Sequence, residues 1–402
     1  MADAELSVSQ AVAQLAALLD PVTACETVPV ADAVDRVLAA PVHARVDQPA
    51  FDNAAMDGYA LRAADLGVPQ MQSCGHSYAG HGFGGSLQSG QCVRIMTGAP
   101  LPDGADTVVI IEDVRVDGST VRVLRAPAAG ANVRRRGEHL RAATPLLAPG
   151  RVLDAVACAL AAGAGVAQVE VRRRLRVGLA STGDELADAP TPLPPAGTYD
   201  ANRPLLLMSL RQLGFDATDL GICTDEGAAF AALLQRAFDL ELDVLLTSGG
   251  AAQGDADVVR QAGGIRFLAL DIRPGRGLAY AVLHRADRRL VLLGLPGNVV
   301  AAYVMFHLVA RPVLRHLASA CGPALPRLWL PLAQAAETRG GRIDWRRARI
   351  VAQDGGARVE LLAEQGSAML RTVAEADALV AIGPAARVPA GTPVEVIPLA
   401  ML

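Results

Sequence analysis

The sequence predicts a multidomain protein in which a central α/β domain is flanked by β-rich regions. Two observations lead to this fold class. The chain has 402 residues, which is too many for one ordinary hydrophobic core. Between Leu175 and about Arg315, short apolar runs alternate with longer helical patterns, as in βαβ units around a parallel sheet. We therefore expect a doubly wound α/β domain at the centre of the chain.

The composition is that of a folded, water-soluble protein. Hydrophobic residues make up 51% of the chain and charged residues 19%. No apolar stretch approaches the roughly 18 residues of a membrane helix, and the acidic first segment lacks the basic region of a signal peptide. The 6 cysteines are scattered and form no CxxC pair, which argues against a zinc site or a disulfide framework. We expect a cytoplasmic protein that makes no membrane contact.

The charged residues narrow the possible functions further. The chain contains no lysine, which excludes a GxxxxGK[ST] phosphate loop, a Schiff-base enzyme and a lysyl-nucleotide ligase. A net charge of -4 with 3% aromatic residues gives no signature of nucleic-acid binding. The triplets Arg134 to Arg136 and Arg172 to Arg174 are expected at solvated strand or turn edges, although an arginine triplet beside a loop can also hold an anion.

Each element of the central domain follows from a local pattern. Apolar runs predict strands, and longer patterns of helical period predict helices. Asp200 or Asn202 is expected to cap one helix that has Pro204 in its first turn. An amphipathic helix is also expected near the N-terminus, beginning at Ser7 or Ser9. The predicted strands of the central domain are residues 175–180, 215–223, 242–247 and 290–293, and the predicted helices are 202–213, 226–238, one from about 255 and one from about 299.

Three polar segments follow predicted strands. They read STGDEL at Ser181 to Leu186, TSGG at Thr247 to Gly250, and GLPGN at Gly294 to Asn298. Ligands of open parallel sheets collect at the carboxyl ends of the strands, so this shared placement predicts a binding site. The glycines of the second segment leave backbone amides free to approach a phosphate.

Two further loop-like segments lie upstream, FDNAAMDGY at Phe51 to Tyr59 and RIMTGAPLPDGAD at Arg94 to Asp106. Taken alone, they are compatible with simple surface turns or with loops that hold a ligand. Together with the three segments above, they resemble the molybdopterin molybdenumtransferases, the MoeA-type proteins and the matching part of gephyrin. The resemblance implies that the chain inserts molybdate into adenylylated molybdopterin and releases AMP, in the last step of molybdenum cofactor synthesis.

The resemblance also implies a four-part, elongated chain. Its parts are an elongated scaffold domain of residues 1–45 plus 140–173, an inserted β-rich domain of residues 46–139, a MogA-like molybdopterin-binding α/β domain of residues 174–322, and a small C-terminal β-barrel of residues 323–402. It further implies a homodimer whose cleft is shared between subunits. The molybdopterin adenylyltransferase and recipient molybdoenzymes are the protein partners that we expect.

Carboxylates are prominent among the candidate site residues. The resemblance assigns roles in activity or binding to Asp57, Thr97, Glu185, Asp225 and Asp257. Carboxylates would repel both a cofactor phosphate and molybdate unless a divalent cation lay between them. We therefore expect Mg²⁺ on oxygen ligands from Asp57, Asp184, Glu185 and Asp257. Each of these residues is also compatible with a helix cap or a turn.

The other candidates are residues expected to bind the substrates. The phosphate and pterin parts are assigned to Ser248, Gly249, Gly250, Pro296, Gly297, Asn298 and Ser367. Molybdate is assigned to Arg273, Arg276 and Arg342. Relatives commonly carry lysine at the first two of these arginines, proline where this chain has Val299, and serine where it has Ala252. Arginine keeps the charge but presents a different donor geometry.

Those departures leave alternatives open. One is a non-catalytic carrier that binds molybdopterin and delivers it. Another is a tungstate-inserting paralogue, because tungstate and molybdate have nearly the same size and charge. An adenylyltransferase is disfavoured, because the smaller proteins with that activity lack the segment from Asp52 to Tyr59.

Overall fold

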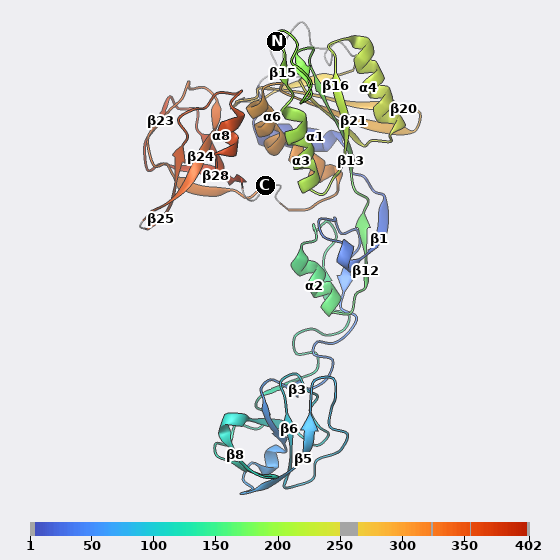
Figure 1. Cartoon of the computed structure of the whole chain (residues 1–402), viewed down its shortest axis with the longest axis vertical. Helices are drawn as coiled ribbons and strands as arrows, with labels where there is room; N and C mark the ends of the chain where they lie inside the picture. Colours follow the sequence, from blue (N-terminus) through green and yellow to red (C-terminus); the bar gives the residue numbers. More distant parts are fainter. Residues whose placement is uncertain (1–4, 250–263, 323–324, 354, 400–402) are drawn as a thin grey trace.

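The computed structural model describes residues 5–249, 264–322, 325–353 and 355–399. The molecule is elongated (Figure 1): a broad body contains the α/β domain and the C-terminal domain side by side, and a narrow stalk connects this body to a separate β-rich domain. The first and last described residues, Glu5 and Leu399, both lie in the body, where Glu5 contacts Arg342 and the Leu399 amide donates to the Asp377 carbonyl. The predicted fold class is confirmed.

The body is built on a six-stranded sheet with the order β16-β13-β17-β21-β20-β18. The first four strands run parallel to one another, β20 runs antiparallel to them, and β18 at the edge runs antiparallel to β20. The bounds are β13 (Arg176–Thr182), β16 (Asp216–Cys223), β17 (Val244–Ser248), β18 (Arg266–Ala269), β20 (Gly277–Arg285) and β21 (Arg288–Leu295). The four parallel strands are those predicted from the sequence, and the antiparallel pair extends the sheet beyond them.

Helices cover both faces of this sheet. Alternation along the strands sends Leu245 and Leu292 into one core with helix α4, and Leu246 and Leu293 into the opposite core with α3 and α6. The bounds are α3 (Asn202–Gln212), α4 (Gly227–Asp239), α6 (Val299–Met305), the π-helical turn η4 (Phe306–Ala310) and α7 (Arg311–Leu317). The predicted helices of residues 202–213 and 226–238 and the one from about 299 are confirmed as α3, α4 and α6. The helix expected from about residue 255 lies outside the described residues.

Helix α1 (Val8–Leu18) begins as predicted, since the Ser7 hydroxyl and the Gln10 side chain form a capping box at its N-terminus. Its apolar face, with Ala11 and Leu15 fully buried, packs into the same core as α7. The domain division expected from the sequence placed this segment in the scaffold. In the structure this helix packs on the α/β domain instead, since its buried apolar residues belong to the core of that domain.

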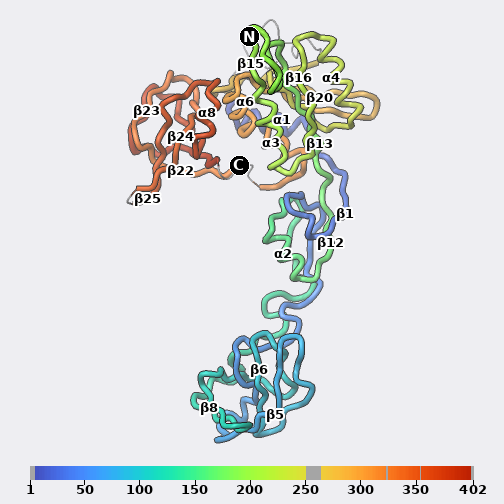
Figure 2. Tube along the Cα trace, in the orientation of Figure 1, coloured from blue at the N-terminus to red at the C-terminus, as the bar shows by residue number. Residues whose placement is uncertain are grey.

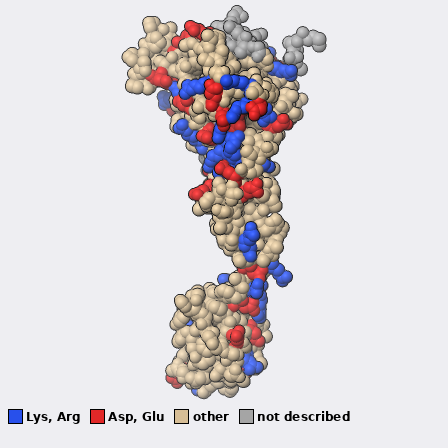
Figure 3. Space-filling model, turned by 90° about the vertical axis from the view of Figure 1, so that its right-hand side faces the viewer, with Lys and Arg blue, Asp and Glu red and all other residues tan. Residues whose placement is uncertain are grey.

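The stalk is a narrow two-stranded connection. β1 (Cys25–Pro29) pairs antiparallel with β12 (Gln168–Arg172), and the two run side by side out of the body (Figure 2). Helix α2 (Ala155–Gly163), capped by Asp154, closes a small core with the 3-10 turn η1 (Val30–Asp32). β2 (Val42–His43) and β11 (Pro145–Leu147) form a second short pair. Figure 3 shows basic and acidic side chains gathered on the body and upper stalk of one face.

The domain beyond the stalk is inserted between the two stalk strands and contains a six-stranded sheet of order β7-β4-β6-β5-β9-β8. The strands are β4 (Gly58–Leu61), β5 (Met71–Ser77), β6 (Gln91–Ile95), β7 (Thr107–Ile110), β8 (Val114–Asp117) and β9 (Thr120–Val123), with β3 (Asn53–Ala54) paired to β10 (Val133–Arg134) and 3-10 turns η2 (Ala63–Asp65) and η3 (Ile111–Asp113).

The C-terminal domain is a sheet of order β19-β24-β26-β28-β22 with β25 paired to β24. Its first strand, β19 (Ile272–Arg273), comes from the α/β domain and pairs parallel with β24. The remaining elements of this domain are β22 (Leu328–Pro331), β24 (Ile343–Gln353), β25 (Gly356–Leu361), α8 (Leu370–Ala374), β26 (Ala378–Ile382) and β28 (Pro393–Pro398), together with a short pair formed by β23 (Ala336–Glu337) and β27 (Arg387–Val388). A second short pair, β14 (Leu186–Ala187) with β15 (Thr198–Tyr199), belongs to the α/β domain. Within the described ranges, no helix has the length and apolar character needed to cross a membrane.

A buried histidine makes the stability of the body depend on pH. His307 is 3% exposed, and within the described residues neither of its ring nitrogens has a hydrogen-bond partner. The rings of Tyr303 and Phe306 lie 4.4 and 5.1 Å away. Burial, with a smaller contribution from the charge of Arg311, lowers the pKa of His307 to about 3.

We expect acid to destabilise the protein through His307. Since its folded pKa lies below the unfolded value of about 6.5, the unfolded state binds the extra proton between these values. The free energy of unfolding therefore falls as the pH drops below about 6.5, by up to ~1.4 kcal/mol per pH unit. The free energy of unfolding, measured by urea denaturation at several pH values between about 4.5 and 7.5, should depend less steeply on pH in His307→Leu than in wild type. The exposed His284, changed to Gln, is the control, and equal slopes for wild type and His307→Leu would contradict this assignment.

Candidate active site

The carboxyl edge of the central sheet is drawn together by glycine turns. The Gly249 amide donates to the Leu295 carbonyl at 3.0 Å. Gly249 has a φ of +99°, and a Cβ there would lie 2.6 Å from the Thr182 carbonyl oxygen, so no larger residue fits. The side-chain amide of Asn202 donates from Nδ2 to the Ser248 hydroxyl and to the Gly297 carbonyl, both at 2.6 Å. The turns after β13, β17 and β21 are therefore fixed against one another.

Three of the predicted carboxylates lie at this edge. The Asp184 carboxylate accepts a hydrogen bond of 3.0 Å from the Asp225 amide. Burial raises the pKa of Asp225, and the nearby negative charges of Asp184 and Glu185 raise it further. Crowded carboxylates of this kind favour a cation. The described residues nevertheless contain no group of three or more histidine, cysteine, aspartate or glutamate side chains placed to hold a metal ion.

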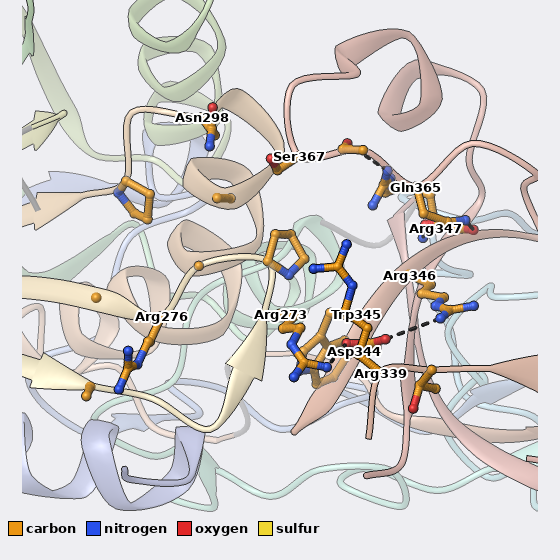
Figure 4. A pocket seen from close by; sticks show the side chains of 18 of the residues that line it. Arg273, Arg276, Asn298, Arg339, Asp344, Trp345, Arg346, Arg347, Gln365 and Ser367 are labelled. Atoms are coloured by element: carbon orange, nitrogen blue, oxygen red, sulfur yellow. Dashed lines mark hydrogen bonds and ion pairs between the residues drawn. The ribbon is translucent and has the colours of Figure 1, made fainter. Parts of the chain in front are cut away.

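A cavity of about 1170 Å³ opens between the α/β domain and the C-terminal domain. One wall is the loop from Arg273 to Gly277 with the turn after β21, and the other is formed by residues 337–339, β24 and residues 365–367 (Figure 4). Five of the predicted residues line it: Arg273, Arg276, Pro296, Asn298 and Ser367. The Val300 amide donates to the Ser367 carbonyl at 3.0 Å, which joins the two walls.

Arginine dominates the cavity, and one carboxylate organises it. Asp344, which is 8% exposed, accepts from Arg273 at 3.5 Å and from Arg346 at 3.2 Å. Arg347 is 1% exposed and donates to Thr372 Oγ1 and the Gly366 carbonyl, both at 3.0 Å. Burial lowers the pKa of Arg347 to about 10. These contacts fix the positions of several positive charges around one space.

Two arginines at the cavity differ in whether a carboxylate pairs with them. Arg276 forms an ion pair of 2.9 Å with Glu5. Arg339 is exposed and forms no hydrogen bond or ion pair with any residue that the structure describes. Since an uncompensated guanidinium is a strong donor for an oxyanion, Arg339 is the cation in this cavity that is most available to a ligand.

The third arginine predicted for molybdate lies elsewhere. Arg342 is not part of the cavity wall, and its Nε donates to Glu5 at 2.7 Å. Hydrogen bonding to Arg342 lowers the pKa of Glu5, so the pair stays ionised at neutral pH. Five further residues line the cavity and were not predicted from the sequence: Arg339, Asp344, Arg346, Arg347 and Gln365. The cluster of arginines around Arg342 was the available signal, because every fixed cation in this chain is arginine.

Asp57 and Thr97 form a pair in the inserted domain. Asp57 Oδ1 accepts from both the amide and the hydroxyl of Thr97 at 2.7 Å, and these hydrogen bonds lower the pKa of Asp57. Within one chain, this domain lies at the far end of the molecule from the cavity (Figure 1). The structure does not bring Asp57 together with Asp184 and Glu185, and Gly250 and Asp257 lie outside the described residues.

Comparison with known proteins agrees with this arrangement. The MoeA N-terminal region (domain I and II) matches residues 6–165, a probable molybdopterin binding domain matches residues 178–316, and the MoeA C-terminal region (domain IV) matches residues 330–399. A molybdopterin molybdenumtransferase of Haemophilus influenzae is 33% identical over 370 residues, 90% of each chain. The chain belongs to this molybdopterin molybdenumtransferase family. The resemblance seen in the sequence is confirmed, and the protein is a transferase of molybdenum cofactor biosynthesis.

Other relatives extend this picture. A molybdopterin molybdenumtransferase of Synechococcus elongatus is 33% identical over 389 residues, covering 93% of this chain and 94% of its own. A molybdopterin biosynthesis MoeA protein of Pyrococcus horikoshii superimposes with a TM-score of 0.82 at 22% identity, over 98% of this chain and 100% of its own. At that identity the likeness concerns the fold. The family membership rests on the sequence matches.

The interaction of Asp225 with Asp184 and Glu185 can be tested through the pKa of Asp225. Asp184→Asn keeps an oxygen acceptor for the Asp225 amide and removes one negative charge, so we expect the pKa of Asp225 to fall towards its ordinary value. Carboxyl ¹³C NMR titration measures this change. Glu185→Gln is the matched control and should have a smaller effect, because Glu185 contributes least to the shift. An unchanged Asp225 titration in Asp184→Asn would show that the two carboxylates do not interact.

Proposed function

We propose that this protein inserts molybdate into adenylylated molybdopterin and releases AMP. The observation that carries this proposal is the arginine-lined cavity of about 1170 Å³ beside the glycine turns of the central sheet. The cavity has room for a ligand of nucleotide size, and its charge suits a ligand that is anionic at both ends. The names of the relatives support the molybdopterin chemistry.

Molybdate is a tetrahedral dianion and binds among the arginines. Arg273 and Arg276, with Arg339 added by the structure, offer guanidinium donors to its oxygens. Asp344 holds Arg273 in place by its ion pair. Arg342 contributes only if its pair with Glu5 opens, so we assign it a role in orienting Glu5 and, through it, Arg276.

The pterin and its phosphates bind along the glycine turns. β17 ends at Ser248 and is followed by Gly249, and residues 296–298 follow β21, so the two turns border one edge of the sheet. The Asn202 side chain holds both turns. Ser367 closes this end of the cavity from the C-terminal domain. Gly250 and Asp257 belong to the same proposed site on the sequence pattern alone.

The carboxylates at the edge of the sheet suit a Mg²⁺ ion that they would share with the substrate phosphates. The raised pKa of Asp225 beside Asp184 and Glu185 is the behaviour of carboxylates that lack a counter-charge. Mg²⁺ in phosphate sites takes one or two carboxylates and completes its shell with water and phosphate oxygens. We propose that Asp184 and Asp225 hold the ion with the substrate phosphates, with Glu185 beside them. When bound, the ion would neutralise phosphate charge.

The Asp57 and Thr97 pair requires a second subunit. Because the inserted domain is remote from its own cavity, we propose a homodimer in which Asp57 and Thr97 of one chain complete the cleft of its partner (Figure 1). The hydrogen bonds that lower the pKa of Asp57 keep it ionised there. The protein is proposed to act in the cytoplasm, between a molybdopterin adenylyltransferase and the recipient molybdoenzymes.

Removal of the Asp57 carboxylate should abolish the reaction. We expect Asp57→Ala to lower molybdate-dependent AMP release from adenylylated molybdopterin by at least about 100-fold, because a positioned carboxylate contributes on this scale. Quantifying AMP by chromatography at low micromolar molybdate measures the loss. Asp117→Ala, on an exposed strand of the same domain, is the control. AMP release at the wild-type rate by Asp57→Ala would remove Asp57 from the mechanism.

The shared cleft has its own test, by mixing variants. Asp57→Ala and Arg273→Gln should each be inactive alone. After the subunits exchange at random, half of the dimers are mixed and have one intact cleft of two, so about one quarter of wild-type activity should return. A mixture that stays inactive although mass analysis shows mixed dimers would place both residues in one chain's cleft.

A carrier function remains the second candidate, because Arg273 and Arg276 are already paired with Asp344 and Glu5. The AMP assay separates the two functions. Release of AMP supports the transferase, whereas tight molybdopterin binding without release supports the carrier, with Ala252, Val299 and Arg273 as the first residues to revert. Tungstate in place of molybdate tests the paralogue.

A further inference from the structure

A second group of arginines surrounds a small cavity where the stalk joins the body. We name it the hinge cavity. Five arginines and one aspartate line it: Asp35, Arg36, Arg172, Arg173, Arg174 and Arg315. They come from the stalk, from the link between β12 and β13, and from the end of α7, the region where the chain narrows in Figure 2. The triplet Arg172 to Arg174 is therefore gathered around a cavity.

The positive charges of the hinge cavity are only partly compensated. Arg36 is paired with Glu26, and Arg173 donates to both oxygens of Asp243 at 3.0 and 2.9 Å. The three other arginines form no ion pair with any described carboxylate. Their acceptors are neutral: Arg172 donates to the Thr23 carbonyl, Arg174 to the Gly214 carbonyl, and Arg315 to the Cys321 carbonyl. Asp35 lines the cavity but forms no ion pair with a described residue.

Two of these arginines have donors without an acceptor. The Nε atoms of Arg172 and Arg315 are buried, and among the described residues they have no hydrogen-bond partner. A buried donor without a partner is unfavourable and is ordinarily satisfied by a ligand or water. Gly214, at a φ of +77°, allows the close approach of Arg174, since a Cβ there would lie 3.0 Å from Arg174 Nη1.

We propose that the hinge cavity binds a tetrahedral oxyanion of the size of inorganic phosphate. Its volume of about 40 Å³ has room for such an ion, since a single water needs only about 10–15 Å³ on this measure. Arginine forks match the oxygen pairs of such an anion. The site is separate from the large cavity, with which it shares no lining residue.

A bound anion restrains the stalk. It contacts Arg172 at the end of β12, Arg174 in the link and Arg315 at the end of α7, so one ligand joins the stalk to the body. Because the connection otherwise consists of two strands, an anion here limits the orientations of the inserted domain. This inference does not depend on the proposed reaction.

Phosphate titration of the full-length protein tests the proposal. Isothermal titration calorimetry is run on wild type and on Arg174→Gln/Arg315→Gln. We expect the double variant to bind phosphate at the hinge at least about ten-fold more weakly, since charge-assisted hydrogen bonds are lost. Arg125→Gln, an exposed arginine of the inserted domain, is the control and should bind as wild type does.

A further variant and a second anion separate this site from the large cavity. Arg273→Gln should keep the binding that the hinge variant loses, and molybdate should compete with phosphate in Arg273→Gln but not in the hinge variant. Small-angle scattering should show a narrower range of shapes with phosphate in wild type and in Arg273→Gln, but not in the hinge variant. Far-UV circular dichroism checks that the hinge variant is folded. Equal phosphate affinity in the folded hinge variant and wild type, or loss of all binding in Arg273→Gln, overturns the proposal.

Discussion

The parallel pairing of β19 with β24 is the interaction on which the cavity depends. Ile272 and Arg273 lie opposite Ile343 and Asp344, so two residues of the α/β domain form the first strand of the C-terminal sheet. Trp345 of the same strand is 4% exposed and belongs to the core of the α/β domain. The two domains therefore share both a sheet and a core, and the cavity between them has fixed walls.

The absence of lysine shapes the rest of the molecule. Every cation is an arginine, and arginine is most stable where its planar fork meets oxygen acceptors. Most arginines of the body are accordingly paired, as with Arg203, which contacts Asp188, Asp200 and Asp219. The mixed charges in Figure 3 reflect this pairing. Some arginines without a carboxylate partner among the described residues, such as Arg339 and Arg174, line cavities.

Much of the central domain was predictable because local patterns decide it. Buried parallel strands are continuous apolar runs, so β13, β17 and β21 were found from their sequences. The edge strand β16, which is only partly buried, was also predicted. The polar segments after these strands located the sheet edge of the site. The antiparallel strands β18 and β20, which pair with each other and, through β20, with β21, were not among the predicted strands. Arg346 and Arg347 were missed, because only the packing of β24 against the α/β domain brings them to the cavity.

The sequence by itself determined the composition of the site: glycine turns after strands, carboxylates beside them, and arginine as the one type of cation. Those properties depend on residue type and local spacing. Tertiary structure decided which of them meet. It paired Arg342 with Glu5, 337 positions away, and left Arg339 without a partner among the described residues. It also placed Asp57 far from Asp184. Such contacts depend on how domains pack, and no local pattern in the chain specifies that packing.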